Sequence, residues 1–181
     1  MSYEDYHKDI KTVAKAFVKL GLEPHRSVAI LGFNSPEWFL SEMGAIYAGG
    51  MSAGLYPTNS LETNVFVMND SRANIFVCED DKQAKAVLAV REELHHLKKI
   101  VVYPRTTLDN NYVIGWDHLM RIGKAYKNNQ VLQDRHKNMA INQCAKLIYT
   151  SGTTGNPKGN TIIVFIEPVR MSPQNLSRSK P

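Results

Sequence analysis

The sequence is poor in cysteine, with only Cys78 and Cys144 among its 181 residues. They form no Cys-x-x-Cys or Cys/His spacing, which excludes a disulfide framework and a zinc site built on paired cysteines. Cys78 ends the apolar run Ile75-Phe76-Val77-Cys78, a position that favours a buried, reduced thiol. We therefore expect a reducing, cytoplasmic environment.

Long apolar runs and blocks of one charge are also missing. The longest apolar run near the end, Ile162 to Ile166, is far shorter than the roughly 20 residues that cross a bilayer. The first ten residues are polar and partly acidic, unlike a secretory signal. The net charge of +5 comes from 22 basic and 17 acidic residues spread along the chain. We expect no transmembrane segment and no nucleic-acid partner, although an anionic ligand would suit this charge.

Ordinary globular composition, with 43% hydrophobic and 22% charged residues, indicates a folded domain. Short apolar runs alternate with helical periodicity. The pattern predicts strands at 27–32, 51–55, 74–78, 99–103 and 145–149, and helices at 6–20, 35–49, 61–69, 82–97 and 116–128. It also predicts a polar helical connector at 130–138 and an irregular stretch at 105–115. The predicted fold class is α/β: part of a doubly wound, mainly parallel sheet with helices on both faces.

Three clusters have the residue types of metal or catalytic sites. The acidic run 79–81 follows a strand, and a helix N-cap with first-turn acids explains it more simply than a metal. The adjacent His95 and His96 would point to different sides of a helix, so they cannot chelate together. Residues 116–118, Trp-Asp-His, have no partner spacing for catalysis and indicate a helix start.

The stretch from Tyr149 to Gly159, YTSGTTGNPKG, follows an apolar strand and has the residues of a phosphate-binding loop. Its glycines bring backbone N–H groups close to a ligand, its four hydroxyls can donate to phosphate oxygens, and its lysine adds positive charge. The candidate residues are Thr150, Ser151, Gly152, Thr153, Thr154, Gly155, Asn156, Pro157 and Lys158. We expect a glycine-rich turn between two strands, with Lys158 exposed.

The loop is not a Walker A motif, because Pro157 stands where that motif has the glycine before its lysine. A P-loop ATPase or GTPase is therefore excluded. A Ser/Thr/Gly-rich surface turn with no ligand stays open as the alternative.

The run 149–159 resembles, without a break, the phosphate-binding signature of AMP-forming adenylate synthetases. A second region, from His25 to Phe39 and on through 48–50 to 56–59, is similar to the long-chain fatty acyl-CoA synthetases, most closely their bubblegum branch. The resemblance covers about residues 1–159. It implies that a fatty acid is joined to AMP with release of pyrophosphate, and that the acyl group then passes to coenzyme A.

The resemblance also implies roles for residues. Thr150 to Lys158 would surround the ATP phosphates, Thr150 would help to hold Mg²⁺, and Lys158 would steady the charge of the leaving pyrophosphate. The implied partners are a long-chain fatty acid, ATP and coenzyme A. Peripheral association with the endoplasmic reticulum or another membrane is left open.

The sequence departs from the family after Gly159, where the family continues with an apolar run and a histidine. The family's later adenine-, ribose- and Mg²⁺-binding elements and its small C-terminal domain are not found. We expect residues 1–159 to be a partial AMP-binding domain and 160–181 a divergent, partly disordered tail. The sequence would then be a truncated form, inactive by itself. The alternatives are a non-catalytic or partner-binding isoform and a stand-alone nucleotide-binding module.

Overall fold

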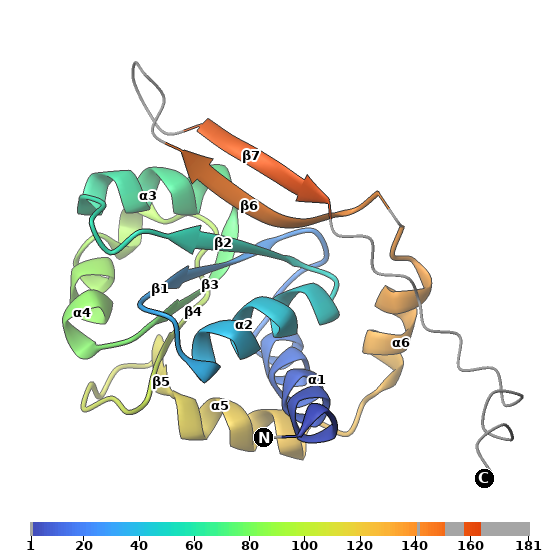
Figure 1. Cartoon of the computed structure of the whole chain (residues 1–181). Coiled ribbons are helices and arrows are strands. Elements are labelled where there is room, and N and C mark those ends of the chain that lie inside the picture. Colours follow the sequence, from blue (N-terminus) through green and yellow to red (C-terminus); the bar gives the residue numbers. More distant parts are fainter. Residues whose placement is uncertain (1, 141, 151–157, 164–181) are drawn as a thin grey trace, which may run out of the picture.

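The computed structural model describes residues 2–140, 142–150 and 158–163. These residues form a seven-stranded sheet in the order β5-β4-β3-β1-β2-β6-β7 (Figure 1). Its strands pair in parallel, except that β7 runs antiparallel to β6. The strands are β1 (Ser27–Leu31), β2 (Met51–Leu55), β3 (Ala73–Cys78), β4 (Lys99–Val102), β5 (Val113–Gly115), β6 (Cys144–Thr150) and β7 (Lys158–Ile163).

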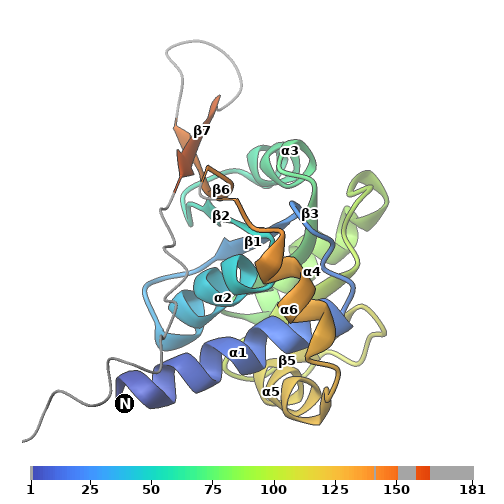
Figure 2. The ribbon, with the colours of Figure 1, turned by 90° about the vertical axis from the view of Figure 1, so that its right-hand side faces the viewer.

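Helices cover both faces of this sheet (Figures 1 and 2). One face carries α1 (Tyr3–Lys19), α2 (Pro36–Tyr47) and α5 (Trp116–Ala125), and the other carries α3 (Leu61–Asp70) and α4 (Asp81–Ala89). A further helix, α6 (Gln130–Lys137), joins the first layer through its buried Leu132. The predicted α/β class, with a mainly parallel sheet between two helical layers, is confirmed.

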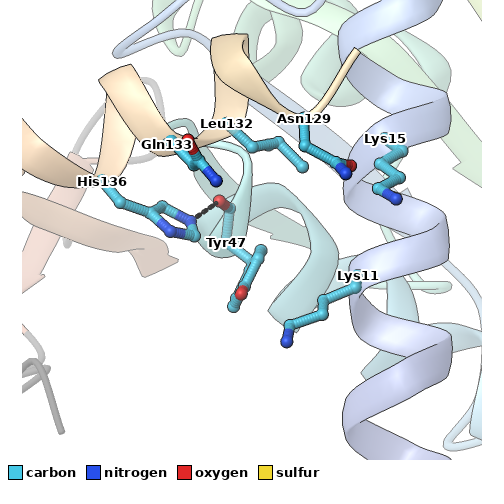
Figure 3. Close-up of a pocket in the computed structure, with 7 residues that line it drawn as sticks. All are labelled: Lys11, Lys15, Tyr47, Asn129, Leu132, Gln133 and His136. Atoms are coloured by element: carbon cyan, nitrogen blue, oxygen red, sulfur yellow. Dashed lines mark hydrogen bonds between the residues drawn. The ribbon is translucent and has the colours of Figure 1, made fainter. Parts of the chain in front are cut away.

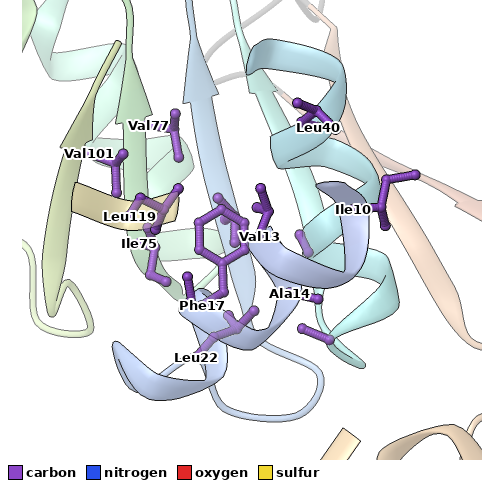
Figure 4. Close-up of a cluster of buried hydrophobic side chains, with 14 of the residues drawn as sticks. Ile10, Val13, Ala14, Phe17, Leu22, Leu40, Ile75, Val77, Val101 and Leu119 are labelled. Atoms are coloured by element: carbon purple, nitrogen blue, oxygen red, sulfur yellow. The ribbon is translucent and has the colours of Figure 1, made fainter. Parts of the chain in front are cut away.

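The central strand β1 shows how the two layers form. All five of its residues are buried, and successive side chains point to opposite faces of the sheet. Val28 and Ile30 join the core under α1 and α2, whereas Ala29 and Leu31 join the core under α3 and α4. Figure 4 shows the first core, in which Phe17 of α1 has no exposed surface.

Local signals set several helix ends. Ser35 caps α2 by accepting a hydrogen bond from the backbone N–H of Trp38, and Pro36 occupies the first turn. Asp80 caps α4 in the same way, accepting from the N–H of Gln83 at 2.7 Å. The N-cap interpretation of the acidic run 79–81 is confirmed. The described residues contain no cluster of His, Cys, Asp and Glu suited to a metal.

The predicted helix over 82–97 is wrong in its second half. Helix α4 ends at Ala89 and a short 3₁₀ turn, Arg91–Glu93, follows. The Arg91 guanidinium donates to the carbonyls of Leu94 (3.1 Å) and Leu97 (2.6 Å), so these carbonyls bond to a side chain. The chain turns there, which leaves His95 and His96 exposed.

Other boundaries also differ from prediction. The stretch expected to be irregular contains β5, a three-residue strand in which only Val113 is buried. Helix α5 ends at Ala125, short of the predicted 128. The strand expected after the loop is β7, which begins at Lys158 and ends at Ile163, and residues 164–166 of the apolar run lie outside the described part. In the described ranges, no helix is long and apolar enough to cross a membrane.

Candidate functional site

The candidate loop is the connection of the β6–β7 hairpin. Thr150 and Lys158 are paired at the last position of this antiparallel ladder, and both are exposed. The two flanking strands and the exposure of Lys158 match the prediction. The candidate residues between them, Ser151, Gly152, Thr153, Thr154, Gly155, Asn156 and Pro157, lie outside the described residues.

The hairpin places this loop at the carboxyl edge of the sheet. Strand β6 runs parallel to β2, with Gly54 opposite Ile148, so Thr150 lies level with the turn that follows β2. That turn contains Tyr56, Pro57 and Thr58. Ligands of open parallel sheets bind outside the carboxyl ends of the strands, which is the edge where this loop is attached.

Tyr149 fixes the base of the hairpin to α3. Its side chain is buried, and its hydroxyl donates to the carboxylate of Asp70 at 2.7 Å. Burial, followed by the hydrogen bond and the charge of Asp70, raises the pKa of Tyr149. Gly159 is the ladder partner of Tyr149, and a Cβ there would lie 3.1 Å from the tyrosine ring. The glycine therefore gives the ring room to lie across β7, so this pair holds the ladder just below the loop.

The chemistry available at the two described loop residues is polar and cationic. The side-chain amide of Asn160 donates to the Thr150 hydroxyl oxygen at 3.2 Å, which leaves the Thr150 hydroxyl hydrogen free for another acceptor. Lys158 is absent from the three ion pairs that the described residues form. An exposed ammonium and an oriented hydroxyl at the two ends of a loop can both contact an anion.

A cavity of about 260 Å³ lies next to β6, at the same edge, and sequence reasoning missed it. Its lining includes Lys146, whose ammonium lies 2.5 Å from the Glu42 carboxylate and 5.2 Å from the centre of the Trp38 ring. Glu42 also accepts from the Ser52 hydroxyl at 3.3 Å. No sequence signal could have found this cluster, because Glu42 and Lys146 are far apart in the chain and meet only through the β2–β6 pairing.

The fold is that of the N-terminal domains of adenylate-forming enzymes. The chain is similar to the anthranilate CoA ligase AuaEII in complex with anthranoyl-AMP, with a TM-score of 0.73 and 21% identity over 89% of this chain and 29% of that one. It is also similar to ATP-bound MatB from Rhodopseudomonas palustris, with a TM-score of 0.67 and 22% identity over 90% of this chain and 29% of that one.

The sequence comparisons go further. The chain matches the AMP-binding enzyme family over residues 1–163, and it belongs to that family. It is 45% identical over 162 residues to the long-chain-fatty-acid–CoA ligase ACSBG2 of Xenopus laevis, and 43% identical over 162 residues to ACSBG1 of Rattus norvegicus. Each alignment covers 88% of this chain and 22% of the relative. The resemblance to bubblegum-type enzymes is confirmed, and the chain spans less than a quarter of the length of these relatives.

Proposed function

We propose that this chain supplies the ATP-phosphate loop of an AMP-forming long-chain fatty acid–CoA ligase. The observation that carries the proposal is the β6–β7 hairpin, which holds Thr150 and Lys158 opposite each other at the carboxyl edge of the sheet. The identity to long-chain-fatty-acid–CoA ligases of Xenopus and rat supports the substrate class.

In the proposed first step, a fatty carboxylate oxygen attacks the α-phosphorus of ATP. The bond from that phosphorus to the bridging oxygen breaks, and pyrophosphate leaves with the electron pair. In the second step the thiol of coenzyme A attacks the acyl carbon, loses its proton and displaces AMP. The loop residues from Thr150 to Lys158 would bind the phosphates through N–H groups, hydroxyls and one ammonium, with the Lys158 charge next to the leaving pyrophosphate.

Thr150 fits the role of a single protein ligand to Mg²⁺. Magnesium keeps several waters and is held by one or two protein oxygens together with substrate phosphates. Thr150 is exposed, and its hydroxyl oxygen is already oriented by Asn160, which suits that role. When bound, the ion would neutralise phosphate charge.

We further propose that residues 1–181 alone bind ATP weakly and do not turn over. Positioning of the reactants supplies roughly 7–11 kcal/mol of barrier reduction in well-oriented reactions. The described residues offer contacts to the ATP phosphates, but these contacts alone orient neither the fatty carboxylate nor the adenosine.

The test joins residues 1–163 to the remainder of the Xenopus relative, in place of that relative's matching segment. We expect the chimera to form acyl-CoA from a long-chain fatty acid, ATP, Mg²⁺ and coenzyme A, and the 181-residue chain to form none. A folded chimera without any acyl-CoA product would contradict the family function. Turnover by the 181-residue chain would contradict the proposal that it is inactive.

A further inference from the structure

A second polar cavity, of about 340 Å³, lies between α1, the end of α2 and α6. Figure 3 shows Lys11 and Lys15 of α1 on one side and Gln133 and His136 of α6 on the other, around Tyr47. This cavity is separate from the candidate loop: α6 lies near the start of β6, and the loop is attached at the other end of that strand (Figure 1).

Hydrogen bonds to backbone carbonyls at the end of α2 and just after α1 fix the α6 wall of the cavity. The Arg135 guanidinium donates to the carbonyls of Ala48 (2.8 Å) and Leu22 (2.9 Å). The Nε2 atom of His136 lies 2.6 Å from the Tyr47 carbonyl, to which it donates. The last carbonyls of a helix lack partners within the helix, so side-chain donors at the end of α2 dock α6 firmly. The cavity is therefore bounded by packed helices.

The charge of the cavity is positive. Lys11 and Lys15 are one helical turn apart on α1, and neither takes part in an ion pair within the described residues. Among the described residues, no Asp or Glu lines this cavity. A neighbouring groove of about 490 Å³ shares both lysines and adds Lys8 and Lys124, against one carboxylate, Glu4. Four lysines around these two hollows, against one carboxylate, create a local attraction for an anion.

The remaining lining residues suit the organic part of a ligand. Asn129 and Gln133 can donate amide hydrogens, and Leu132, which is buried, adds apolar surface next to the ring of Tyr47. A volume above about 300 Å³ is in the range of small-molecule sites and is more than a bare phosphate needs.

We propose that this cavity binds the phosphate monoester of an organic molecule, either a soluble metabolite or a phospholipid headgroup. The ammonium groups of Lys11 and Lys15 would contact the phosphate, and the amides of Asn129 and Gln133 would contact the attached polar group. The site is independent of the proposed ligase chemistry, because it uses none of the loop residues.

The test uses the purified 181-residue chain and two probes. Calorimetric titration with glycerol 3-phosphate tests binding of a soluble phosphate monoester. Sedimentation with phosphatidylcholine vesicles, with and without phosphatidic acid, tests binding of a phospholipid headgroup. The variant is Lys11→Gln/Lys15→Gln. Its control, Lys82→Gln/Lys85→Gln, removes the same charge from exposed lysines of α4 on the opposite face. Circular dichroism and a thermal melt establish that both variants are folded.

We expect the Lys11/Lys15 variant to bind the probe about 100-fold more weakly than the wild type, which is about tenfold for each of two charge-assisted contacts. The affinity of the control variant should change by less than about threefold. Binding of glycerol 3-phosphate would assign a soluble ligand, and binding only to phosphatidic acid vesicles would assign a headgroup. The proposal is overturned if neither probe binds or if the Lys11/Lys15 variant binds as the wild type does. It is also overturned if Lys158→Ala abolishes binding, because the candidate loop would then be the site.

Discussion

Replacing Tyr149 with phenylalanine tests whether the base of the hairpin is held by the bond to α3. The change removes a hydroxyl that donates to Asp70 at 2.7 Å and leaves the ring against Gly159. Hydrogen bonds to charged groups contribute about 1.5–3 kcal/mol. Asp70 is exposed and can exchange this bond for water, so we expect the low end, a loss of about 1.5 kcal/mol.

The assay is urea unfolding of the 181-residue chain at neutral pH, with Tyr56→Phe as the control. Tyr56 is 51% exposed, and its replacement should change stability by less than about 0.5 kcal/mol. The Tyr149→Phe midpoint should fall with an unchanged slope, because the surface exposed on unfolding is nearly the same.

The same pair of proteins should respond differently to alkali. The folded state raises the pKa of Tyr149 above its ordinary value near 10, mainly through burial. A raised pKa means that the folded state holds this proton more tightly. The contribution of protonated Tyr149 to the stability of the folded state is therefore complete below about pH 10 and is lost as the pH rises through the folded-state pKa. The difference in free energy of unfolding between wild type and Tyr149→Phe should become smaller above about pH 10. Equal urea midpoints of wild type and Tyr149→Phe at pH 7 would refute the anchoring role of Tyr149. A stability difference that grows in alkali would refute it as well.

Two further predictions concern the core. Gly123→Ala should cost at least about 2 kcal/mol despite the better helix propensity of alanine, because the new Cβ would overlap the backbone carbonyl oxygen of Thr12; denaturant unfolding measures this. Gly54→Ala is its control, since a Cβ there lies 3.7 Å from Trp38, and equal stability of the two variants would contradict the close approach of α1 and α5. Cys144, which is half-buried, should react with a thiol reagent before Cys78. Burial raises the pKa of both thiols, but only Cys78 is fully buried, so the reagent reaches Cys144 first. Mass spectrometry of the modified peptides measures the order, and labelling of Cys78 first in the folded chain would be inconsistent with its burial in β3.

Much of the fold was predictable because the signals are local. The serine and proline at 35–36 start α2 within one residue of prediction, and the apolar runs give β1 to β4 nearly in full. The apolar period fails as a guide where a side-chain hydrogen bond ends an element or where the element is very short. Helix α4 ends early where Arg91 bonds the carbonyls that follow it, and β5 is too short for a period to be visible.

The same division applies to the candidate site. The composition of the loop predicted a connection between two strands with an exposed lysine, and both strands are present. The bond from Tyr149 to Asp70 and the pair of Glu42 with Lys146 depend on strand order, which no local pattern specifies. The basic cavity likewise needs α1 and α6 together, and the sequence gives their lysines and amides only as separate helix faces.

The proposed role of Lys158 is to act on the phosphates of ATP during adenylation. The most direct measurement is pyrophosphate release by the chimera described above, comparing Lys158→Ala with Lys85→Ala, which removes an exposed lysine of α4. We expect Lys158→Ala to lower kcat by about 10²–10³-fold, the usual cost of losing one group that stabilises developing charge, with little change in KM for the fatty acid. Lys85→Ala should leave both constants unchanged. Equal kcat in the two variants, or a loss confined to KM for the fatty acid, would contradict the claim.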